Sequence, residues 1–154
     1  MINRKLYYME MADLTIAQKS KDQSSKVGCV IVNNDDVVGA CNTIPNGCKD
    51  EEYKHERPEK YYWFVHAETH TIAKAARLGI STDGGHMFLN WYPCSGCAGL
   101  IVQAGIKKLY VDCEPNWNDN IRGKDRQRSK EILESGGVEV IYMNYKAHRQ
   151  GLDN

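Results

Sequence analysis

The sequence lacks long apolar runs, and it lacks an excess of charge of either sign. No stretch is apolar over the roughly 20 residues that a membrane-spanning helix needs, and residues 1–5 are not followed by an apolar run of signal-peptide length. We therefore expect a cytoplasmic protein with no membrane partner. Lys and Arg together number 20, as do Asp and Glu. Because proteins that bind duplex nucleic acid normally carry a basic excess, we expect no such partner.

Disulfide bonds are not indicated either, although the chain has six cysteines. Two of them belong to one Cys-x-x-Cys motif. The other four show no paired spacing: Cys29, Cys41, Cys48 and Cys113. We interpret these four as reduced thiols, which agrees with a cytoplasmic protein.

The chain of 154 residues has the size of one domain with one core, and it contains no repeat, low-complexity tract or linker. We expect residues 1–154 to form a single domain. Residues 43–62 contain two prolines and many charges and are predicted to form a long loop, either functional or mobile. Periodicity and turn residues predict helices over residues 3–21, 66–78, 94–104 and 124–135, and strands over residues 26–32, 36–42, 86–92, 107–112 and 138–143.

The order of these elements predicts the fold class. One helix and two strands are followed by three helix–strand pairs, which indicates an α/β protein with a five-stranded mixed sheet between two layers of helices, a three-layer α/β/α domain. The two strand–helix–strand units of the second half should form parallel pairs with right-handed crossovers.

The strongest chemical signal is His66-Ala67-Glu68 followed by Pro93-Cys94-Ser95-Gly96-Cys97. The imidazole of His66 and the thiolates of Cys94 and Cys97 are three zinc ligands, and they leave a fourth position for water, as in catalytic zinc sites. Both segments lie where a helix is predicted to begin, which places the two cysteines on one face. This pattern is the signature of zinc deaminases that act on nucleobases. We therefore predict Zn²⁺ as the cofactor.

Glu68 is not needed as a ligand, and we predict it to be the catalytic residue. It would take a proton from a zinc-activated water and deliver it to a ring nitrogen and then to the departing ammonia. The matching chemistry is hydrolytic deamination of an amidine-like carbon, such as C4 of cytosine or C6 of adenine.

A structural zinc site is the main alternative. His70 lies four residues after His66 and could complete a Cys₂His₂ tetrahedron with Cys94 and Cys97. The protein would then be a zinc-stabilised nucleotide-binding or interaction module, in which Glu68 has no role. Aromatic residues near the long loop could stack on a base or form a lid or a subunit interface: Tyr53, Tyr61, Tyr62 and Trp63. Trp117 is interpreted as an anchor of its own loop, with a place in a base or phosphate pocket as the alternative.

Over nearly its whole length the chain resembles the deoxycytidylate (dCMP) deaminases of the cytidine deaminase superfamily. Besides the zinc motif, four parts carry the resemblance: SKD and SKVGCVIV at residues 20–22 and 25–32, CNTIPNGC at 41–48, ERPEKY at 56–61 and QAGIK at 103–107. The resemblance implies a cytidine deaminase-like fold and conversion of dCMP to dUMP and ammonia. It also implies a homo-oligomer, with a nucleoside triphosphate as a possible effector.

The same resemblance implies a small-molecule nucleotide substrate. Asn42 would hydrogen-bond the sugar, and Lys26 is a candidate contact of the 5′-phosphate, with Lys21 and Arg57 as further available cations.

Two positions depart from the family pattern. Thr43 replaces the glycine of Asn-Gly, and His70 replaces the asparagine of His-Ala-Glu-x-Asn. We expect His70 to change how the pocket contacts the sugar or the base, and to leave the zinc chemistry unchanged. A modified cytosine nucleotide, another base or a free nucleoside are therefore alternative substrates.

Overall fold

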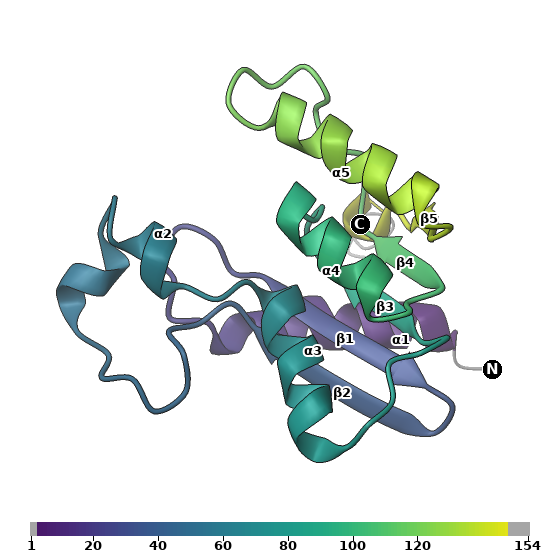
Figure 1. The fold of residues 1–154 in the computed structure, drawn as a ribbon, viewed down its shortest axis with the longest axis horizontal. Helices are drawn as coiled ribbons and strands as arrows, with labels where there is room; N and C mark the ends of the chain where they lie inside the picture. The colour runs from purple at the N-terminus through teal and green to yellow at the C-terminus, as the bar shows by residue number, and fades with distance from the viewer. Residues whose placement is uncertain (1–2, 148–154) are drawn as a thin grey trace.

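A five-stranded mixed sheet organises residues 3–147, the part of the chain that the structure, a computed structural model, describes (Figure 1). β1 is antiparallel to β2 and to β3, whereas β3–β4 and β4–β5 are parallel pairs. The predicted mixed sheet with two parallel pairs in its second half is confirmed. In spatial order the strands are β2 (Asp36–Cys41), β1 (Gly28–Asn33), β3 (His86–Leu89), β4 (Lys108–Val111) and β5 (Glu139–Tyr142).

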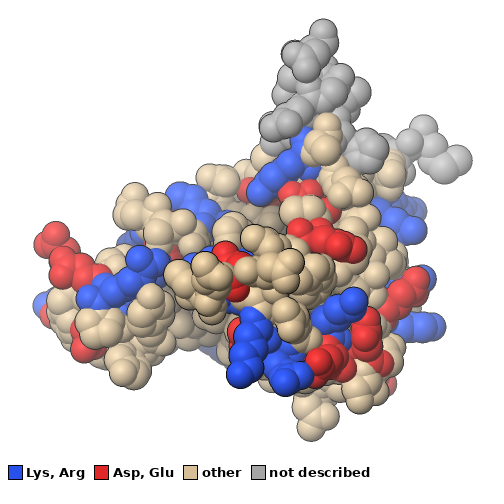
Figure 2. Space-filling view, turned by 90° about the horizontal axis from the view of Figure 1, so that it is seen from above, with Lys and Arg blue, Asp and Glu red and all other residues tan. Residues whose placement is uncertain are grey.

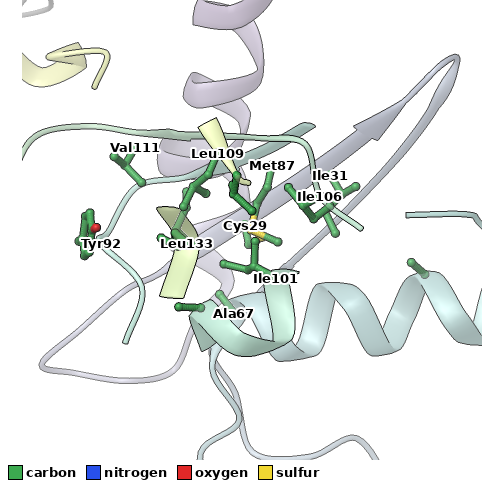
Figure 3. Packing of buried hydrophobic residues seen from close by; sticks show 14 of the residues in the cluster. Cys29, Ile31, Ala67, Met87, Tyr92, Ile101, Ile106, Leu109, Val111 and Leu133 are labelled. Atoms are coloured by element: carbon green, nitrogen blue, oxygen red, sulfur yellow. The ribbon is translucent and has the colours of Figure 1, made fainter. Parts of the chain in front are cut away.

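Helices cover both faces of this sheet because successive side chains of a strand point to opposite faces. On β1, Cys29 and Ile31 pack against one layer of helices, and Val30 packs with residues of the N-terminal helical segment on the other face. Figure 3 shows Ile101 meeting Met87 and Leu109 in the first of these two cores. The three-layer arrangement is thus confirmed. The first layer consists of α3 (Ala67–Leu78), α4 (Ser95–Gln103) and α5 (Gly123–Ser135).

The opposite layer is a helical segment that changes its pitch along its length. The side chain of Asn3 caps its start by accepting hydrogen bonds from two backbone N–H groups. The predicted N-terminal helix is therefore confirmed, but its second half is a π-helical turn and a 3₁₀ turn. The three parts are α1 (Arg4–Glu10), η1 (Met11–Ile16) and η2 (Ala17–Lys19).

Residues 43–65 form an ordered excursion between β2 and α3, which extends away from the sheet in Figure 1. Thr43 and Val65 close its base through two backbone hydrogen bonds of 3.1 and 2.8 Å. The prediction of a long loop over residues 43–62 is wrong in part, because the segment contains η3 (Glu52–His55) and α2 (Lys60–Trp63). Lys54 is buried inside it, where its Nζ lies 4.0 Å from the ring centroid of Trp63.

The surface carries charges of both signs. On the face shown in Figure 2, Lys and Arg side chains are interspersed with Asp and Glu side chains. This agrees with the balanced composition of the sequence. Among residues 3–147, no helix is both long and apolar enough to cross a membrane.

Gly28 lies where the N-terminal helical segment packs most closely on β1. A Cβ atom at this position would lie 2.0 Å from the carbonyl oxygen of Ala12 and 2.7 Å from the amide nitrogen of Ala17. We expect Gly28→Ala to lower the free energy of unfolding by about 1–3 kcal/mol or more, because backbone atoms must move apart. Urea unfolding measures this change.

Gly99→Ala is the matched control. Gly99 lies inside α4, where a Cβ would meet no atom within 4 Å. This change should keep or raise stability, by about 0.5–1 kcal/mol, since alanine favours a helix over glycine. Equal stability of Gly28→Ala and the unchanged protein would contradict the close packing of η1 and η2 on β1.

Candidate active site

The beginnings of two neighbouring helices bring the three predicted zinc ligands together. His66 is the N-cap of α3, and Cys94 is the N-cap of α4, with Cys97 in the first turn. Nδ1 of His66 lies 3.5 Å from Sγ of Cys94 and 3.4 Å from Sγ of Cys97. Zinc–sulfur and zinc–nitrogen bonds of about 2.3 and 2.0 Å at tetrahedral angles separate neighbouring ligand atoms by about 3.5 Å. The geometry therefore matches one zinc ion.

Hydrogen bonds among His66, Cys94 and Cys97 shift the pKa values of all three side chains. Hydrogen bonding with Cys97 lowers the pKa of Cys94 to about 4, and the same contact raises the pKa of Cys97. The hydrogen bond to Cys94 likewise raises the pKa of His66. A zinc ion takes the place of such shared protons, because it binds thiolates and a neutral imidazole. The donor set thus fits a metal chemically as well as geometrically.

His70 does not belong to this group. Among the described residues, the ligand atoms that lie within 4.8 Å of one another come from His66, Cys94 and Cys97 alone. Nδ1 of His70 lies 2.8 Å from the backbone oxygen of Cys41, at the end of β2, and donates a hydrogen bond to it. The arrangement of a closed Cys₂His₂ site is therefore not seen.

Glu68 is buried beside the predicted ligands, with 4% of its surface exposed, and it lines the same pocket as His66 and Cys94. Burial raises the pKa of its carboxyl group, although hydrogen bonding to its own backbone N–H opposes this. A raised pKa brings a carboxyl group nearer to the pH at which it can both accept and donate a proton.

The turn that carries Cys94 is held by α5. Asp125 accepts hydrogen bonds from the backbone N–H and the hydroxyl of Ser95, the first residue of α4. Asp125 also lines the pocket. The sequence does not indicate this contact, because Asp125 lies in a charged run, residues 124–130, that has the pattern of a solvated helix face.

The pocket itself has a volume of about 550 Å³ and combines three parts of the chain. His66, Glu68 and Cys94, which include two of the predicted zinc ligands and the predicted catalytic residue, are part of its lining. One wall comes from the 43–65 segment and includes Arg57, Lys60, Tyr61 and Phe64; the opposite side includes Trp91, Ile121, Arg122, Asp125 and Arg126. The volume is in the range of sites for small molecules.

Asn42 also lines the pocket, where it joins a buried polar network. Its side-chain oxygen accepts from the amide of Val27 at 3.0 Å, and its side-chain nitrogen donates to Ser25 at 2.8 Å and to Asp22 at 3.2 Å. Burial acts to raise the pKa of Asp22, but an ion pair with Lys60 at 2.7 Å and hydrogen bonds from Ser24 outweigh burial and lower it. The predicted contact of Asn42 with a sugar stays a prediction.

Lys26 and Lys21 face a different pocket. Both line a neighbouring surface hollow with Asp50 and His55, and Lys26 donates a hydrogen bond to the backbone oxygen of Ser20. Of the predicted available cations, only Arg57 lines the pocket that contains Glu68. His70 is also outside its lining, so any effect on substrate choice would pass through Cys41.

Of the aromatic residues considered for base stacking, Tyr61 lines the pocket. Tyr53 and Trp63 pack edge to face on each other, and Tyr62 is 81% exposed. Trp117 packs edge to face on Tyr92, with ring centroids 5.4 Å apart. This contact anchors the loop that precedes α5, as interpreted from the sequence.

Known proteins are similar to this chain in sequence and in fold. The model of the cytidine and deoxycytidylate deaminase zinc-binding region matches residues 2–113. A deoxycytidylate deaminase of Pongo abelii is 39% identical over 111 residues, which cover 67% of this chain and 61% of that protein. The chain thus spans less than two thirds of that relative. An uncharacterized deaminase from the luxG 3′ region of Aliivibrio fischeri is 33% identical over 139 residues, covering 88% of this chain and 90% of the relative.

A solved structure agrees over almost the full length. It is the dCMP deaminase of cyanophage S-TIM5 in complex with dCMP and dUMP, with a TM-score of 0.73 and 30% identity, covering 93% of this chain and 99% of that one. The fold and the His-Cys-Cys group define the class, an α/β protein of the cytidine deaminase-like fold. The chain belongs to the cytidine and deoxycytidylate deaminase family. Within it, the similarities point to the dCMP deaminases.

Proposed function

We propose that this protein is a zinc-dependent hydrolase that converts dCMP and water to dUMP and ammonia. One observation carries the proposal: a buried carboxylate, Glu68, lines a pocket beside a three-membered His-Cys-Cys group. A structural zinc site has four protein ligands and needs neither a pocket nor a spare carboxylate. Similarity to the S-TIM5 enzyme, which binds dCMP and dUMP, supports the choice of substrate.

His66, Cys94 and Cys97 would hold the metal. Zinc bound to three protein side chains supplies a Lewis acid that lowers the pKa of water to about 7. Two thiolates and one neutral imidazole would balance the charge of Zn²⁺, so the complex of the ion and its ligands would be near neutral. Burial of Cys97 and the hydrogen bonds between Ser95 and Asp125 would restrict the positions of the ligand atoms.

Glu68 would carry both protons of the attacking water. As the new bond to C4 of cytosine forms, the carboxylate accepts one proton and passes it to N3, where it stays in the uracil product. It then accepts the second proton and delivers it to the amino group as the C4–N bond breaks and ammonia leaves. A carboxyl group with a raised pKa suits this exchange, since it must be a base and an acid within one turnover.

The test measures ammonia release and zinc content together. The purified protein should contain one zinc per chain and release ammonia from dCMP, and removal of zinc by a chelator should abolish release until zinc is restored. A panel of cytosine, 5-substituted cytosine and adenine nucleotides, each with its nucleoside, identifies the base. Zinc binding without ammonia release from any member would support the non-enzymatic alternative, a zinc-stabilised nucleotide-binding module.

Asp125→Ala should weaken zinc binding. The change removes the acceptor that holds the backbone N–H and hydroxyl of Ser95, next to the ligand Cys94. Groups that orient metal ligands contribute roughly 10- to 100-fold in metal affinity or activity. Competition with a chelator of known affinity measures this loss.

Two further variants serve as comparisons. Ser95→Ala keeps the backbone N–H and should lose less affinity than Asp125→Ala. Glu131→Ala changes an exposed acid on the same helix, paired with Arg128, and should bind zinc like the unchanged protein. Zinc affinity of Asp125→Ala equal to that of Glu131→Ala would show that α5 does not hold the Cys94 turn.

The homo-oligomer, the nucleoside triphosphate effector and the cytoplasmic location stay predictions. Exposed apolar side chains near the pocket, such as Tyr62 and Ile121, are available for contact with a second copy. Native mass spectrometry with and without a nucleoside triphosphate tests the first two predictions.

A further inference from the structure

We propose that Arg122 and Arg126, at the beginning of α5, bind the 5′-phosphate of the substrate. The inference rests on the proposed function, because it names the phosphate-binding residues of the same pocket. Both side chains line that pocket, across from the 43–65 segment. They are four residues apart, so they lie on one face of the helix and can reach one anion together.

Within the described part of the chain their guanidinium groups form no ion pair, whereas Lys60, another cation of the pocket, does. Lys60 is paired with Asp22 at 2.7 Å, and both of these side chains are largely buried. Asp125 accepts its hydrogen bonds from Ser95. None of the ion pairs found within residues 3–147 includes Arg122 or Arg126. On this side of the pocket the two guanidinium groups outnumber the one carboxylate in the lining, Asp125.

The turn that presents Arg122 is rigidly built. Asp119 Oδ1 accepts hydrogen bonds from the backbone N–H of Ile121 at 3.0 Å and of Arg122 at 2.7 Å. The next residue, Gly123, is buried so closely under Trp117 that a Cβ there would lie 2.4 Å from the Trp117 carbonyl oxygen. These contacts fix the backbone of the turn, and a fixed backbone lowers the entropy lost when a ligand binds.

The same helix is also fixed relative to the catalytic groups. Asp125 lies between the two arginines in sequence and bonds to Ser95, directly after Cys94. A phosphate held by the arginines would therefore have a set position relative to the zinc ligands and Glu68. Arginine suits this task, because its planar group of N–H donors binds phosphate oxygens in pairs.

Two other cation sites are weaker candidates. Lys26, the contact implied by the family resemblance, lines a different pocket and bonds to Ser20. Arg57 lines the pocket from the opposite wall, 5.8 Å from the ring centroid of Tyr61. It is one cation without a neighbouring second arginine, so it offers fewer donors to a dianion.

The experiment compares each nucleotide with its nucleoside. In Arg122→Gln and Arg126→Gln, kcat/KM for dCMP should fall by about 10- to 100-fold each, because each loses charge-assisted hydrogen bonds, whereas kcat/KM for deoxycytidine should stay within about threefold. Calorimetry of dUMP and deoxyuridine binding gives the same comparison without turnover, so it remains decisive if the protein does not deaminate dCMP.

Arg128→Gln and Lys26→Gln complete the set. Arg128 lies on the same helix but is exposed and pairs with Glu131 at 2.7 Å, so its loss should leave the preference for dCMP over deoxycytidine unchanged. An equal fall for nucleotide and nucleoside in the Arg122 and Arg126 variants would overturn the proposal, since the arginines would then support the pocket and not the phosphate. A phosphate-selective fall in Lys26→Gln, with none in the arginine variants, would also overturn it.

Discussion

Glu68→Gln should retain its zinc and bind dCMP, and should lose deamination by about 10²- to 10⁴-fold or more, the contribution of a positioned acid–base group. The amide has nearly the same shape as the carboxyl group, but it cannot accept a proton from water and return it to the leaving amine. Because Glu68 is 4% exposed, bulk water has little access to replace it as the proton carrier. Single-turnover ammonia release measures the loss.

Glu139→Gln is the matched control for this change. Glu139 lies on β5, is largely exposed and pairs with Lys108 at 3.4 Å, outside the pocket lining. Its variant should deaminate at the normal rate. A zinc-loaded Glu68→Gln protein that keeps more than a tenth of the normal kcat would remove Glu68 from the proposed mechanism.

The close approach of His66, Cys94 and Cys97 could be predicted from the sequence because each half of the group is local. Cys94 and Cys97 are three residues apart at the beginning of a helix, directly after Pro93, which is common at helix starts. His66 lies at the beginning of another helix, which ends at Gly79. Such signals depend on neighbours in the chain, and the structure reproduces both helix starts within one residue. Only the meeting of the two halves needs the sheet. β2 and β3 are both antiparallel to β1, so α3 and α4, which follow these two strands in the chain, begin at the same edge of the sheet.

The walls of the pocket could not be predicted in this way. Arg126 belongs to a run of charges over residues 124–130 that has the pattern of a solvated helix face, and Arg122 ends the polar segment 114–122 before it. Their place in the pocket follows from long-range packing, in which Trp117 contacts Tyr92 and Gly123 lies under the Trp117 backbone. No local pattern records these contacts. Two arginines four residues apart directly after the apolar Ile121 are the local signal that could have pointed to this edge.

Side-chain direction was equally hidden in the sequence. His70 lies one helical turn after His66, which suggested a position in the pocket, but its ring bonds to the Cys41 carbonyl at the edge of α3 that faces β2. Thr43, the second departure from the family pattern, needs no special backbone conformation. The glycine of the family pattern is not required here, because Thr43 pairs with Val65 as a strand does and is not among the residues with positive φ.

Cys94→Ser should lose zinc affinity and keep the fold. The Sγ of Cys94 caps α4 by accepting the backbone N–H of Cys97, and serine is a preferred residue at this position, so the helix should still begin at the same place. A hydroxyl group, however, is a poor substitute for a thiolate as a zinc ligand. We expect zinc affinity to fall by roughly 10³-fold or more, since one of three ligands is lost from a site whose full affinity is of the order of 10–16 kcal/mol in small zinc proteins.

Activity should fall with the metal. Zinc analysis after dialysis against a chelator, together with circular dichroism and ammonia release, distinguishes loss of the ion from loss of the fold. Cys113→Ser and Cys48→Ser are the matched controls, because both thiols are exposed and lie outside the ligand group, so both variants should keep one zinc and full activity. A folded Cys94→Ser protein that holds zinc as tightly as Cys113→Ser would show that Cys94 is not a ligand, and the metal would then have to be assigned to other side chains.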